Sequence, residues 1–430
     1  MPLTRLDLRG SSGDLAALLP PPVDEQARSS TAVSEILAAV RAGGDAALVE
    51  LTERFDGVRL DTLAVPADVV AGAVDRVAPE LRDALEVAHR RIAAYHRHEL
   101  AASDVFTSEG VTVRPLVRPV ARAGCYAPGG RARYPSTVLM CATPARVAGV
   151  DEVVLCVPPA PDGSVDDATL AAAAIAGVDE VYRVGGAQAV AAMAYGTESI
   201  APVDVIVGPG NRYVAEAKRQ VSGVVGVASA FAGPSEVVVV AAPGTRPELA
   251  AVDVVVQAEH GPDGQAWLVT WDEALAGTVE AEIDRIVAAS SRRGDLESTL
   301  STGGYSVLVD GPDAAIAVAN VVAPEHLELM VPPDLAGSMV DAVRSAGAVF
   351  VGEDAPASLG DYLAGPNHVL PTNRTARFAS ALRADDFVRH IHVVTATPAA
   401  LADLGPRVVA LAEAEGLEAH AASIRARWDR

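Results

Sequence analysis

The residues best suited to chemistry in this sequence are histidines close to carboxylates or side-chain amides. Gln257 and His260 are three residues apart, and Gly261-Pro262 follows directly and ends the expected helix. Residues at this spacing share one helix face, so both side chains are expected to face outward from the last turn. An amide oxygen and an imidazole placed in this way could provide two ligands to a metal ion. The alternative is a histidine at a helix C-terminus, where the helix dipole favours a cation.

Three further segments combine carboxylates with histidines. Glu325 and His326 are adjacent. Neighbours on a helix point about 100° apart, so these two side chains would flank one substrate without bonding to each other. Asp361 and His368 stand in one glycine-containing loop. The third segment is a helical stretch near the C-terminus that contains Glu413, Glu415, Glu418 and His420. Each segment alone could be solvated charge, but together they supply nitrogen and oxygen ligands that suit zinc, manganese, cobalt or iron.

Two glycine turns follow apolar runs and precede helical patterns, namely Gly185-Gly186-Ala187-Gln188 and Gly208-Pro209-Gly210-Asn211. Glycine allows a ligand to approach closely, and the free N–H groups at the start of the next helix could bind an anion at the carboxyl ends of the strands. The Gly-x-Gly-x-x-Gly fingerprint of dinucleotide-binding proteins is missing. Ordinary connections between strand and helix are therefore the alternative.

Other enzyme classes are disfavoured by the residues they need. Ser235 opens a strand pattern but lacks the Gly-x-Ser-x-Gly frame of a hydrolase nucleophile. Lys218 is the only lysine, and no Gly-x-x-x-x-Gly-Lys-Ser/Thr motif contains it. The sequence therefore argues against a hydrolytic triad, a Schiff-base enzyme and a P-loop kinase.

Composition limits the class of protein further. The chain has 430 residues, 50% of them hydrophobic, which excludes disorder as the main state. The 34 basic and 56 acidic residues give a net charge of −22, which argues against nucleic acid or an anionic membrane as a partner. No apolar stretch is long enough to span a membrane, and the N-terminus lacks a signal-peptide pattern. Cys125, Cys141 and Cys156 stand in apolar surroundings, so we expect reduced thiols and a cytoplasmic protein.

Short apolar runs alternate with longer helical patterns beyond about residue 150, which is typical of a parallel sheet. Strands are predicted for residues 153–157, 180–184, 204–207, 236–240, 266–270, 306–309 and 348–351. Helices are predicted for residues 168–176, 187–195, 211–221, 247–259 and 273–288, and also for 32–53, 79–99 and 401–428. The last helical stretch is interrupted at Gly405-Pro406 and at Gly416. The sequence therefore predicts two α/β units in tandem, followed by a helical tail.

The motifs that contain these residues closely resemble the histidinol dehydrogenase family, the zinc- and NAD-dependent oxidoreductases of histidine biosynthesis. They follow the order of the family from about residue 30 to the end of the chain, which makes the resemblance specific. The matching segments are Tyr126-Ala127-Pro128-Gly129-Gly130, Tyr134-Pro135-Ser136, Gly185-Gly186-Ala187-Gln188-Ala189, Tyr195-Gly196-Thr197-Glu198, Val207-Gly208-Pro209-Gly210-Asn211, Ala232-Gly233-Pro234-Ser235-Glu236, Gln257-Ala258-Glu259-His260, Ala323-Pro324-Glu325-His326-Leu327, Gly360-Asp361-Tyr362 and Asn367-His368-Val369-Leu370-Pro371.

The resemblance implies a role for each candidate residue. One zinc ion per subunit would be bound by Gln257, His260, Asp361 and His420. The substrate, L-histidinol, would be contacted by these four residues, by the catalytic pair Glu325 and His326, and by Ser235, His368 and Glu415. NAD would be contacted by Tyr126, Gln188 and Asn211. Family members are homodimers whose C-terminal tail reaches the partner's site, so Glu415 and His420 would act in trans.

The resemblance also implies the reaction, a four-electron oxidation of L-histidinol to L-histidine through bound L-histidinal with two NAD. His326 would take the alcohol proton, which suits an imidazole that titrates near neutral pH. Glu325 would activate the water that attacks the aldehyde, and His326 would assist the second hydride transfer. Zinc would position the substrate through its imidazole and amino nitrogens, and holding the aldehyde avoids loss of a reactive intermediate.

The expected fold class is α/β, with two tandem Rossmann-like, incomplete doubly wound domains, an N-terminal helical segment and a small C-terminal helical tail domain. Residues 1–25 would form an N-terminal arm. Residues 26–123 and 236–380 would form the first α/β domain, with the metal and catalytic residues. Residues 124–235 would form the second α/β domain on the NAD side. Residues 381–430 would form the tail that reaches the dimer partner.

Two stretches depart from the pattern of the family. Residues 227–231, Val-Ala-Ser-Ala-Phe, stand where the family usually has Gly-Ile-Asp, and residues 378–387 replace a common Ser-Ser-Gly-Leu-Ser stretch. These departures leave open a paralogous zinc- and NAD-dependent dehydrogenase of another polar alcohol, amino or sulfonated. A binding protein that had lost catalysis would be expected to lack Glu325 or His326, and both are present. Cys125, beside Tyr126, has packing as its simplest role.

Overall fold

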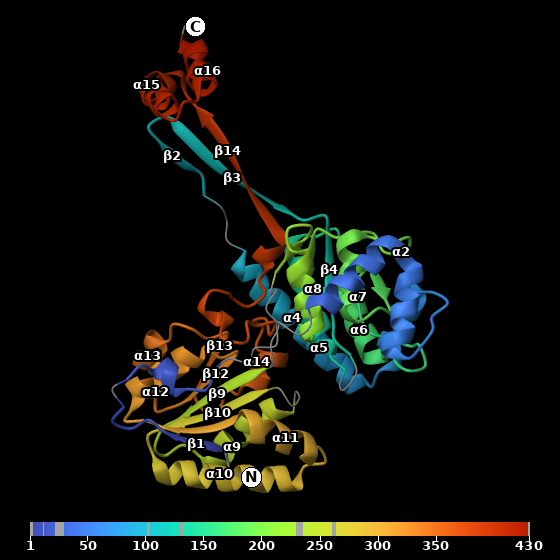
Figure 1. Ribbon diagram of the computed structural model, residues 1–430, viewed down its shortest axis with the longest axis vertical. Coiled ribbons are helices and arrows are strands. Elements are labelled where there is room, and N and C mark those ends of the chain that lie inside the picture. The colour runs from blue at the N-terminus through green and yellow to red at the C-terminus, as the bar shows by residue number, and fades with distance from the viewer. Residues whose placement is uncertain are drawn as a thin grey trace. The chain divides into compact units, whose positions relative to one another are not determined.

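The computed structural model describes residues 3–11, 13–21, 30–100, 104–129, 133–228, 235–259 and 264–428. The chain divides into two compact units (Figure 1). The large unit comprises Met1–Glu99 and Ala121–Phe387, and the small unit comprises Leu100–Val120 and Val388–Arg430. The predicted α/β class with parallel sheets is confirmed, and the parallel sheets both lie in the large unit.

A five-stranded parallel sheet in the order β6-β5-β4-β7-β8 forms one half of the large unit. Its strands are β4 (Arg122–Tyr126), β5 (Glu152–Cys156), β6 (Glu180–Tyr182), β7 (Val205–Val207) and β8 (Gly226–Val227). The helices between them are α5 (Pro135–Ala148), α6 (Asp167–Ala176), α7 (Gly186–Tyr195) and α8 (Arg212–Val221). After their first residues the central strands β4, β5 and β7 are apolar and buried, as expected for a sheet covered on both faces.

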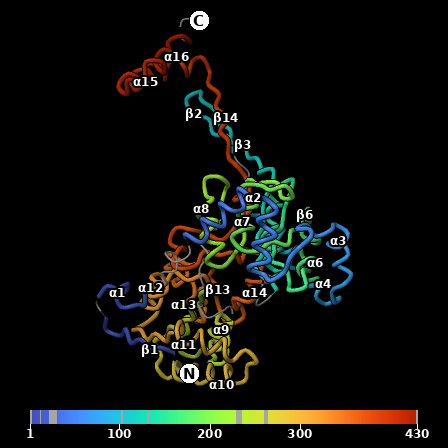
Figure 2. The backbone as a smooth tube through the Cα atoms, turned by 45° about the vertical axis from the view of Figure 1, so that its right-hand side comes forward, coloured from blue at the N-terminus to red at the C-terminus, as the bar shows by residue number. Residues whose placement is uncertain are grey.

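Three N-terminal helices complete the layers around this sheet. They are α2 (Ser30–Asp56), α3 (Ala67–Arg76) and α4 (Pro79–Glu99). Helix α2 packs against α7 and α8, α3 packs against α6, and α4 packs against α5 and α6 (Figures 1 and 2). The sequence predicts that residues 26–123 belong to the same domain as residues 236–380, and this domain assignment is wrong for the three helices. Their apolar stripes, such as Val33, Leu37 and Val40 of α2, share a core with α7 and α8 instead.

A six-stranded parallel sheet in the order β1-β11-β10-β9-β12-β13 forms the other half of the large unit. Its strands are β1 (Thr4–Asp7), β9 (Glu236–Ala241), β10 (Gln265–Thr270), β11 (Gly304–Leu308), β12 (His326–Met330) and β13 (Ala348–Val351). The helices of this half are α1 (Leu15–Leu18), α9 (Pro247–Ala258), α10 (Glu273–Ala289), α11 (Arg293–Gly303), α12 (Pro312–Val322), α13 (Pro333–Ala342) and α14 (Ala357–Tyr362). Two short 3-10 turns follow, η2 (Thr375–Arg377) and η3 (Ala384–Phe387).

Two expectations about this half are wrong. The N-terminal arm is not separate, because β1 adds a parallel edge strand next to β11. Residues 326–330 form the buried strand β12 between β9 and β13, although the sequence suggested a helix. Every residue of β12 is buried, so the run lacks the polar face by which an exposed strand is recognised.

The small unit is an antiparallel sheet with two helices, and the tail was expected to be helical only. Strands β2 (Phe106–Ser108), β3 (Val111–Pro119) and β14 (Val388–Ala396) pair in the order β14-β3-β2. Helix α15 (Pro398–Ala414) continues through Pro406, while α16 (Glu418–Trp428) begins after Gly416, which has a φ of 72°. The predicted interruption is therefore confirmed at Gly416 and wrong at Gly405-Pro406.

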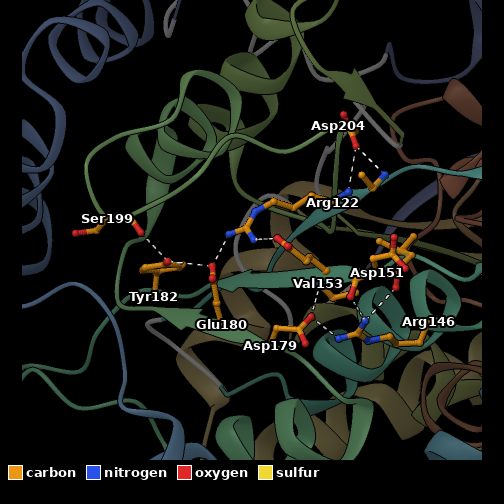
Figure 3. Close-up of polar contacts among 12 residues, drawn as sticks. Arg122, Arg146, Asp151, Val153, Asp179, Glu180, Tyr182, Ser199 and Asp204 are labelled. Atoms are coloured by element: carbon orange, nitrogen blue, oxygen red, sulfur yellow. Dashed lines mark hydrogen bonds and ion pairs between the residues drawn. The ribbon is translucent and has the colours of Figure 1, made fainter.

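Charged residues at the amino edge of the five-stranded sheet pair with one another (Figure 3). Arg122, at the start of β4, bonds to Glu152 and Glu180 at the starts of β5 and β6. Asp204 accepts hydrogen bonds from the backbone N–H groups of residues 121 and 122 at 2.8 and 3.0 Å. These contacts hold the amino ends of adjacent strands together. They leave the carboxyl edge, where open α/β sheets bind their ligands, as the place for a site.

The three cysteines are buried and their thiols are free, and burial raises the pKa of Cys141 and of Cys156 to about 12. Cys125 is buried in the same way and its pKa is also raised, so its thiol is held in the unreactive protonated form. Within the ranges given above, no helix has both the length and the apolar character needed to cross a membrane.

Candidate functional site

Glu325 and His326 lie where the amino ends of β9 and β12 meet in the six-stranded sheet. Both are buried, with 7% and 2% of their surface exposed. His326 Nε2 lies 3.1 Å from Oδ1 of Asp361, which comes from α14. His326 Nδ1 lies 3.8 Å from Glu325 Oε2, beyond hydrogen-bond distance, so the two side chains do not bond directly, as expected. The backbone N–H of Glu236 donates to Glu325 Oε2 at 3.1 Å.

The buried carboxylates set the charge of this cluster. Burial raises the pKa of Glu325 to about 7, against the opposing effect of the nearby His326. Burial alone would lower the pKa of His326, but Glu325 and Asp361 outweigh it and raise that pKa to about 9. Glu325 is thus a carboxyl group that changes its protonation state near neutral pH, as a general base must.

One nitrogen of the His326 ring is left for a ligand. Its Nε2 is held by Asp361, whereas Nδ1 has no hydrogen-bond partner among the residues that the structure describes. When Nε2–H donates to Asp361, the neutral ring carries its lone pair on Nδ1, and with a pKa of about 9 this neutral form gains population as the pH rises toward 9. The arrangement, a histidine oriented by an acid with its second nitrogen free, is the one used for proton abstraction.

His368 connects this cluster to the other half of the large unit. Its Nδ1 lies 2.8 Å from the backbone oxygen of Asp361, and its Nε2 lies 3.2 Å from Oγ1 of Thr137 in the first turn of α5. The neighbouring Asn367 donates from Nδ2 to the backbone oxygen of Met140 at 2.6 Å. The amino edge of the six-stranded sheet is therefore joined to α5, which follows the carboxyl end of β4.

Of the four predicted metal ligands, only Gln257 and Asp361 are described residues of the large unit. Gln257 is the second-last residue of α9 and is 3% exposed, so it does not face outward as expected. Its side-chain nitrogen has no hydrogen-bond partner there. His260 lies outside the described residues, and Glu415 and His420 are exposed residues of the small unit. No group of three or more His, Cys, Asp or Glu residues within those ranges is arranged to hold a metal ion.

The three residues expected to contact NAD line one cavity at the carboxyl edge of the five-stranded sheet. The cavity has a volume of about 1310 Å³, and Tyr126, Gln188 and Asn211 all contribute to its wall. This exceeds the roughly 300–1,000 Å³ of sites for drug-sized molecules, so an extended ligand such as a dinucleotide can be accommodated. The expectation of a site next to the two glycine turns is thus supported by a cavity of suitable size.

The turns themselves show why glycine stands there. A Cβ atom on Gly208, whose φ is 105°, would lie 2.1 Å from the backbone oxygen of Tyr126. One on Gly185 would lie 2.5 Å from Cγ of Pro158. The Tyr126 hydroxyl accepts a hydrogen bond from the N–H of Gly186 at 3.2 Å, and Asn211 caps α8 through its Oδ1. These contacts bring the starts of α7 and α8 to the cavity, where the positive end of a helix can meet phosphate.

Sequence reasoning missed several residues of these sites. Glu236 lies beside Glu325. It is a carboxylate at the start of an otherwise apolar strand, and this local feature could have marked it as a site residue. Asp56 ends a helix with a negative charge that opposes the helix dipole. Thr137 had no local signal, because only the tertiary fold brings it to His368.

Comparison with known proteins agrees with this arrangement. The family model described as histidinol dehydrogenase matches residues 21–428. Histidinol dehydrogenase of Gluconobacter oxydans (strain 621H) is 46% identical over 433 residues and that of Rhodospirillum rubrum is 48% identical over 434, with at least 99% of each chain covered. A crystal structure of histidinol dehydrogenase from Elizabethkingia anophelis matches with a TM-score of 0.94 at 33% identity, covering 99% of this chain and 98% of that one.

A buried acid–base pair and a dinucleotide-sized cavity in one two-sheet α/β fold, together with these relatives, define an oxidoreductase. The chain belongs to the histidinol dehydrogenase family. Of the two departures from the family pattern, residues 229–231 lie outside the described residues, and residues 378–387 lead into η3, whose Phe387 is fully buried.

Proposed function

We propose that the protein oxidises L-histidinol to L-histidine through bound L-histidinal, and that two NAD accept the two hydrides in turn. The observation that carries this proposal is the free Nδ1 of His326, on a buried ring that Asp361 holds and that lies beside Glu325. Supporting it, the residues proposed to contact NAD, Tyr126, Gln188 and Asn211, line one large cavity.

The two catalytic residues have different tasks. His326 Nδ1 receives the hydroxyl proton of the substrate alcohol while a hydride leaves the carbon that bears this hydroxyl for NAD, which yields the aldehyde. Glu325 then takes a proton from water as the water oxygen attacks the aldehyde carbon, and His326 gives its proton to the aldehyde oxygen, which yields the hydrate. His326 next takes a hydroxyl proton of this hydrate as the second hydride leaves its carbon for the second NAD. The product carboxyl thus contains one oxygen from the alcohol and one from water. Burial of Glu325 and His326 keeps the aldehyde away from bulk solvent.

Ser235 and His368 are proposed to hold the substrate. Ser235 immediately precedes β9 and donates a side-chain hydrogen bond toward Glu325, which places it at the catalytic carboxylate. His368 is fixed between Asp361 and Thr137, so its ring has one orientation. Both residues therefore stand beside the acid–base pair, where a polar substrate must bind.

Zinc is proposed to bind to Gln257, His260, Asp361 and His420. The donor set of nitrogen and oxygen atoms suits zinc, and the buried Gln257 would bind it through the amide oxygen Oε1. When bound, zinc would hold the imidazole and amino nitrogens of the substrate and so fix the alcohol beside His326.

The C-terminal tail is proposed to complete the site of a partner subunit in a homodimer. Glu415 and His420, which would contact the substrate and the metal, belong to the small unit and are exposed there. Exposed apolar residues of the same unit, Val394 and Leu411 with 62% and 66% exposure, are consistent with a surface that a second copy covers. The buried free thiols are consistent with the reducing cytoplasm that we propose as the location.

The test is NADH production with L-histidinol as the sole substrate, on enzyme stripped by a chelator and then returned to zinc. We expect about two NADH per histidinol, because each hydride transfer reduces one nicotinamide, and only after zinc is restored. Histidinol-dependent NADH at a ratio near one would contradict the second oxidation. Metal-dependent turnover of another polar alcohol, with none of histidinol, would contradict the substrate.

A further inference from the structure

Asp56 brings a carboxylate to the wall of the large cavity. It is the last residue of α2, and Gly57, with a φ of 75°, ends the helix directly after it. Its Oδ2 is buried and has no hydrogen-bond partner among the residues that the structure describes. The nearby Tyr126, another residue of the wall, has its pKa raised in part by the charge of Asp56.

This placement is unfavourable for the protein without a ligand. A carboxylate at the C-terminus of a helix opposes the helix dipole, and burial raises the pKa of Asp56 to about 6. A buried acceptor without a donor also loses its hydration without replacement. Such a side chain is explained when a ligand provides the missing donors.

The hydroxyl groups of a ribose are donors of the required kind. Two vicinal hydroxyls can donate to the two oxygens of one carboxylate, and an acidic residue near a phosphate-binding turn performs this task in other dinucleotide-binding proteins. In this chain Asp56 shares the cavity with Gly186 and Asn211 at the starts of α7 and α8.

The position of α2 indicates which ribose is bound. Helix α2 packs against α7 and α8, whereas the catalytic cluster is reached through Thr137 of α5. The nicotinamide must point toward that cluster to receive a hydride. The ribose beside Asp56 is then the one at the adenine end.

Charges around the cavity agree with a ribose that has no phosphate. Four carboxylates and two guanidinium groups contribute to the wall, and Arg133 is already paired with Asp166 at 2.9 Å. A 2′-phosphate would bring further negative charge next to Asp56, in a wall that already has more carboxylates than guanidinium groups.

We propose that Asp56 accepts hydrogen bonds from the 2′- and 3′-hydroxyls of the adenosine ribose and so makes the enzyme select NAD over NADP. This inference rests on the proposed use of the cavity by NAD. It adds a specificity-determining residue to that site, and Asp56 touches the cofactor only at the end remote from the reacting carbon.

The test compares Asp56→Asn with Glu50→Gln, which removes one exposed carboxylate from the same helix away from the cavity. Calorimetry should show that Asp56→Asn binds ADP-ribose at least about tenfold more weakly than the wild type, because hydrogen bonds to a charged acceptor are lost. Glu50→Gln should bind ADP-ribose as the wild type does. The KM for NAD should rise by a similar factor with kcat within about twofold. The kcat/KM ratio of NADP to NAD should rise at least about tenfold.

A second measurement has a wild-type arm that does not depend on the folding of a variant. Wild-type enzyme should bind 2′-deoxy-ADP-ribose about tenfold more weakly than ADP-ribose, and Asp56→Asn should bind the two equally. Equal binding of both ligands by the wild type, or unchanged ADP-ribose affinity of a folded Asp56→Asn, would overturn the role of Asp56 while histidinol turnover stands. Absence of any NAD reduction by the wild type would overturn the proposed function instead.

Discussion

Replacing Glu236 by glutamine should stabilise the protein above pH 5 and increasingly so up to pH 8. Glu236 is 3% exposed, and its Oε2 has no hydrogen-bond partner within the described ranges. Burial, with the nearby Glu325, raises its pKa from 4.5 to about 8. The carboxyl group is therefore neutral in the folded protein at pH 7 and ionised in the unfolded chain.

The sign of the effect follows from proton binding. The folded state holds a proton that the unfolded state has released, so the stability of the wild type falls as the pH rises from 4.5 toward 8. At about 1.4 kcal/mol per pKa unit, the loss between pH 5 and pH 8 is about 3 kcal/mol. Glutamine does not titrate, so Glu236→Gln escapes this loss.

The assay is thermal unfolding of chelator-treated enzyme at pH 5 and pH 8, with Glu248→Gln, on the exposed face of α9, as the control. The difference in Tm between Glu236→Gln and wild type should grow by several degrees from pH 5 to pH 8, since about 1 kcal/mol shifts Tm by roughly 2–4 °C in domains of 150–250 residues. The control should show no such growth. An equal Tm difference at both pH values would mean that Glu236 is ionised in the fold, and the reasoning from burial would be refuted.

Three further expectations concern catalysis, the glycine turns and the tail. Glu325→Gln should lower kcat for histidinol oxidation by about 10²–10⁴-fold. It should leave the affinity for ADP-ribose unchanged, because Glu325 lies outside the cavity wall. Initial rates of NADH formation measure the first effect and calorimetry the second, and a parallel loss of affinity would contradict separate sites. Gly208→Ala should lower Tm far more than Gly223→Ala. Both glycines have positive φ (105° and 96°), but only a Cβ at position 208 would meet another atom, the backbone oxygen of Tyr126 at 2.1 Å. Equal losses for the two variants, each of the about 1–3 kcal/mol that backbone strain alone costs, would argue against the close approach. Mixing Glu325→Gln chains with His420→Asn chains should recover about a quarter of wild-type activity. Half of the resulting dimers contain one chain of each variant, and each such mixed dimer keeps one of its two sites intact if the tail acts in trans. No recovery would place the tail at the site of its own subunit.

Much of the fold was predictable from the sequence because the strands of both sheets are short apolar runs bounded by turns. The predicted strand 153–157 corresponds to β5, 236–240 to β9 and 266–270 to β10, within one or two residues. Periodicity was least informative for β12, because all its residues are buried and include the polar His326 and Glu328. A strand that buries charged groups has no apolar pattern to read.

The assignment of helices to domains could not be predicted, because it depends on which apolar faces meet. Helices α2 and α4 precede the five-stranded sheet and pack on its helices, while β1 crosses to the other sheet and pairs with β11. The sheet of the small unit joins β3 to β14, segments more than 250 residues apart in the chain. Such pairings leave no trace in local sequence.

The sequence by itself determined the chemical groups and the class of fold. Glycines at positions 185 and 208, the Glu325-His326 pair and the alternation of apolar runs are local features, set by backbone sterics and side-chain chemistry. The tertiary structure alone decided the protonation and the geometry. It buries Glu325 and Glu236 side by side, turns Nε2 of His326 toward Asp361, and brings Asp56 to the cavity of Tyr126. Desolvation and hydrogen bonding depend on what surrounds a side chain, and those surroundings exist only once distant segments have packed together.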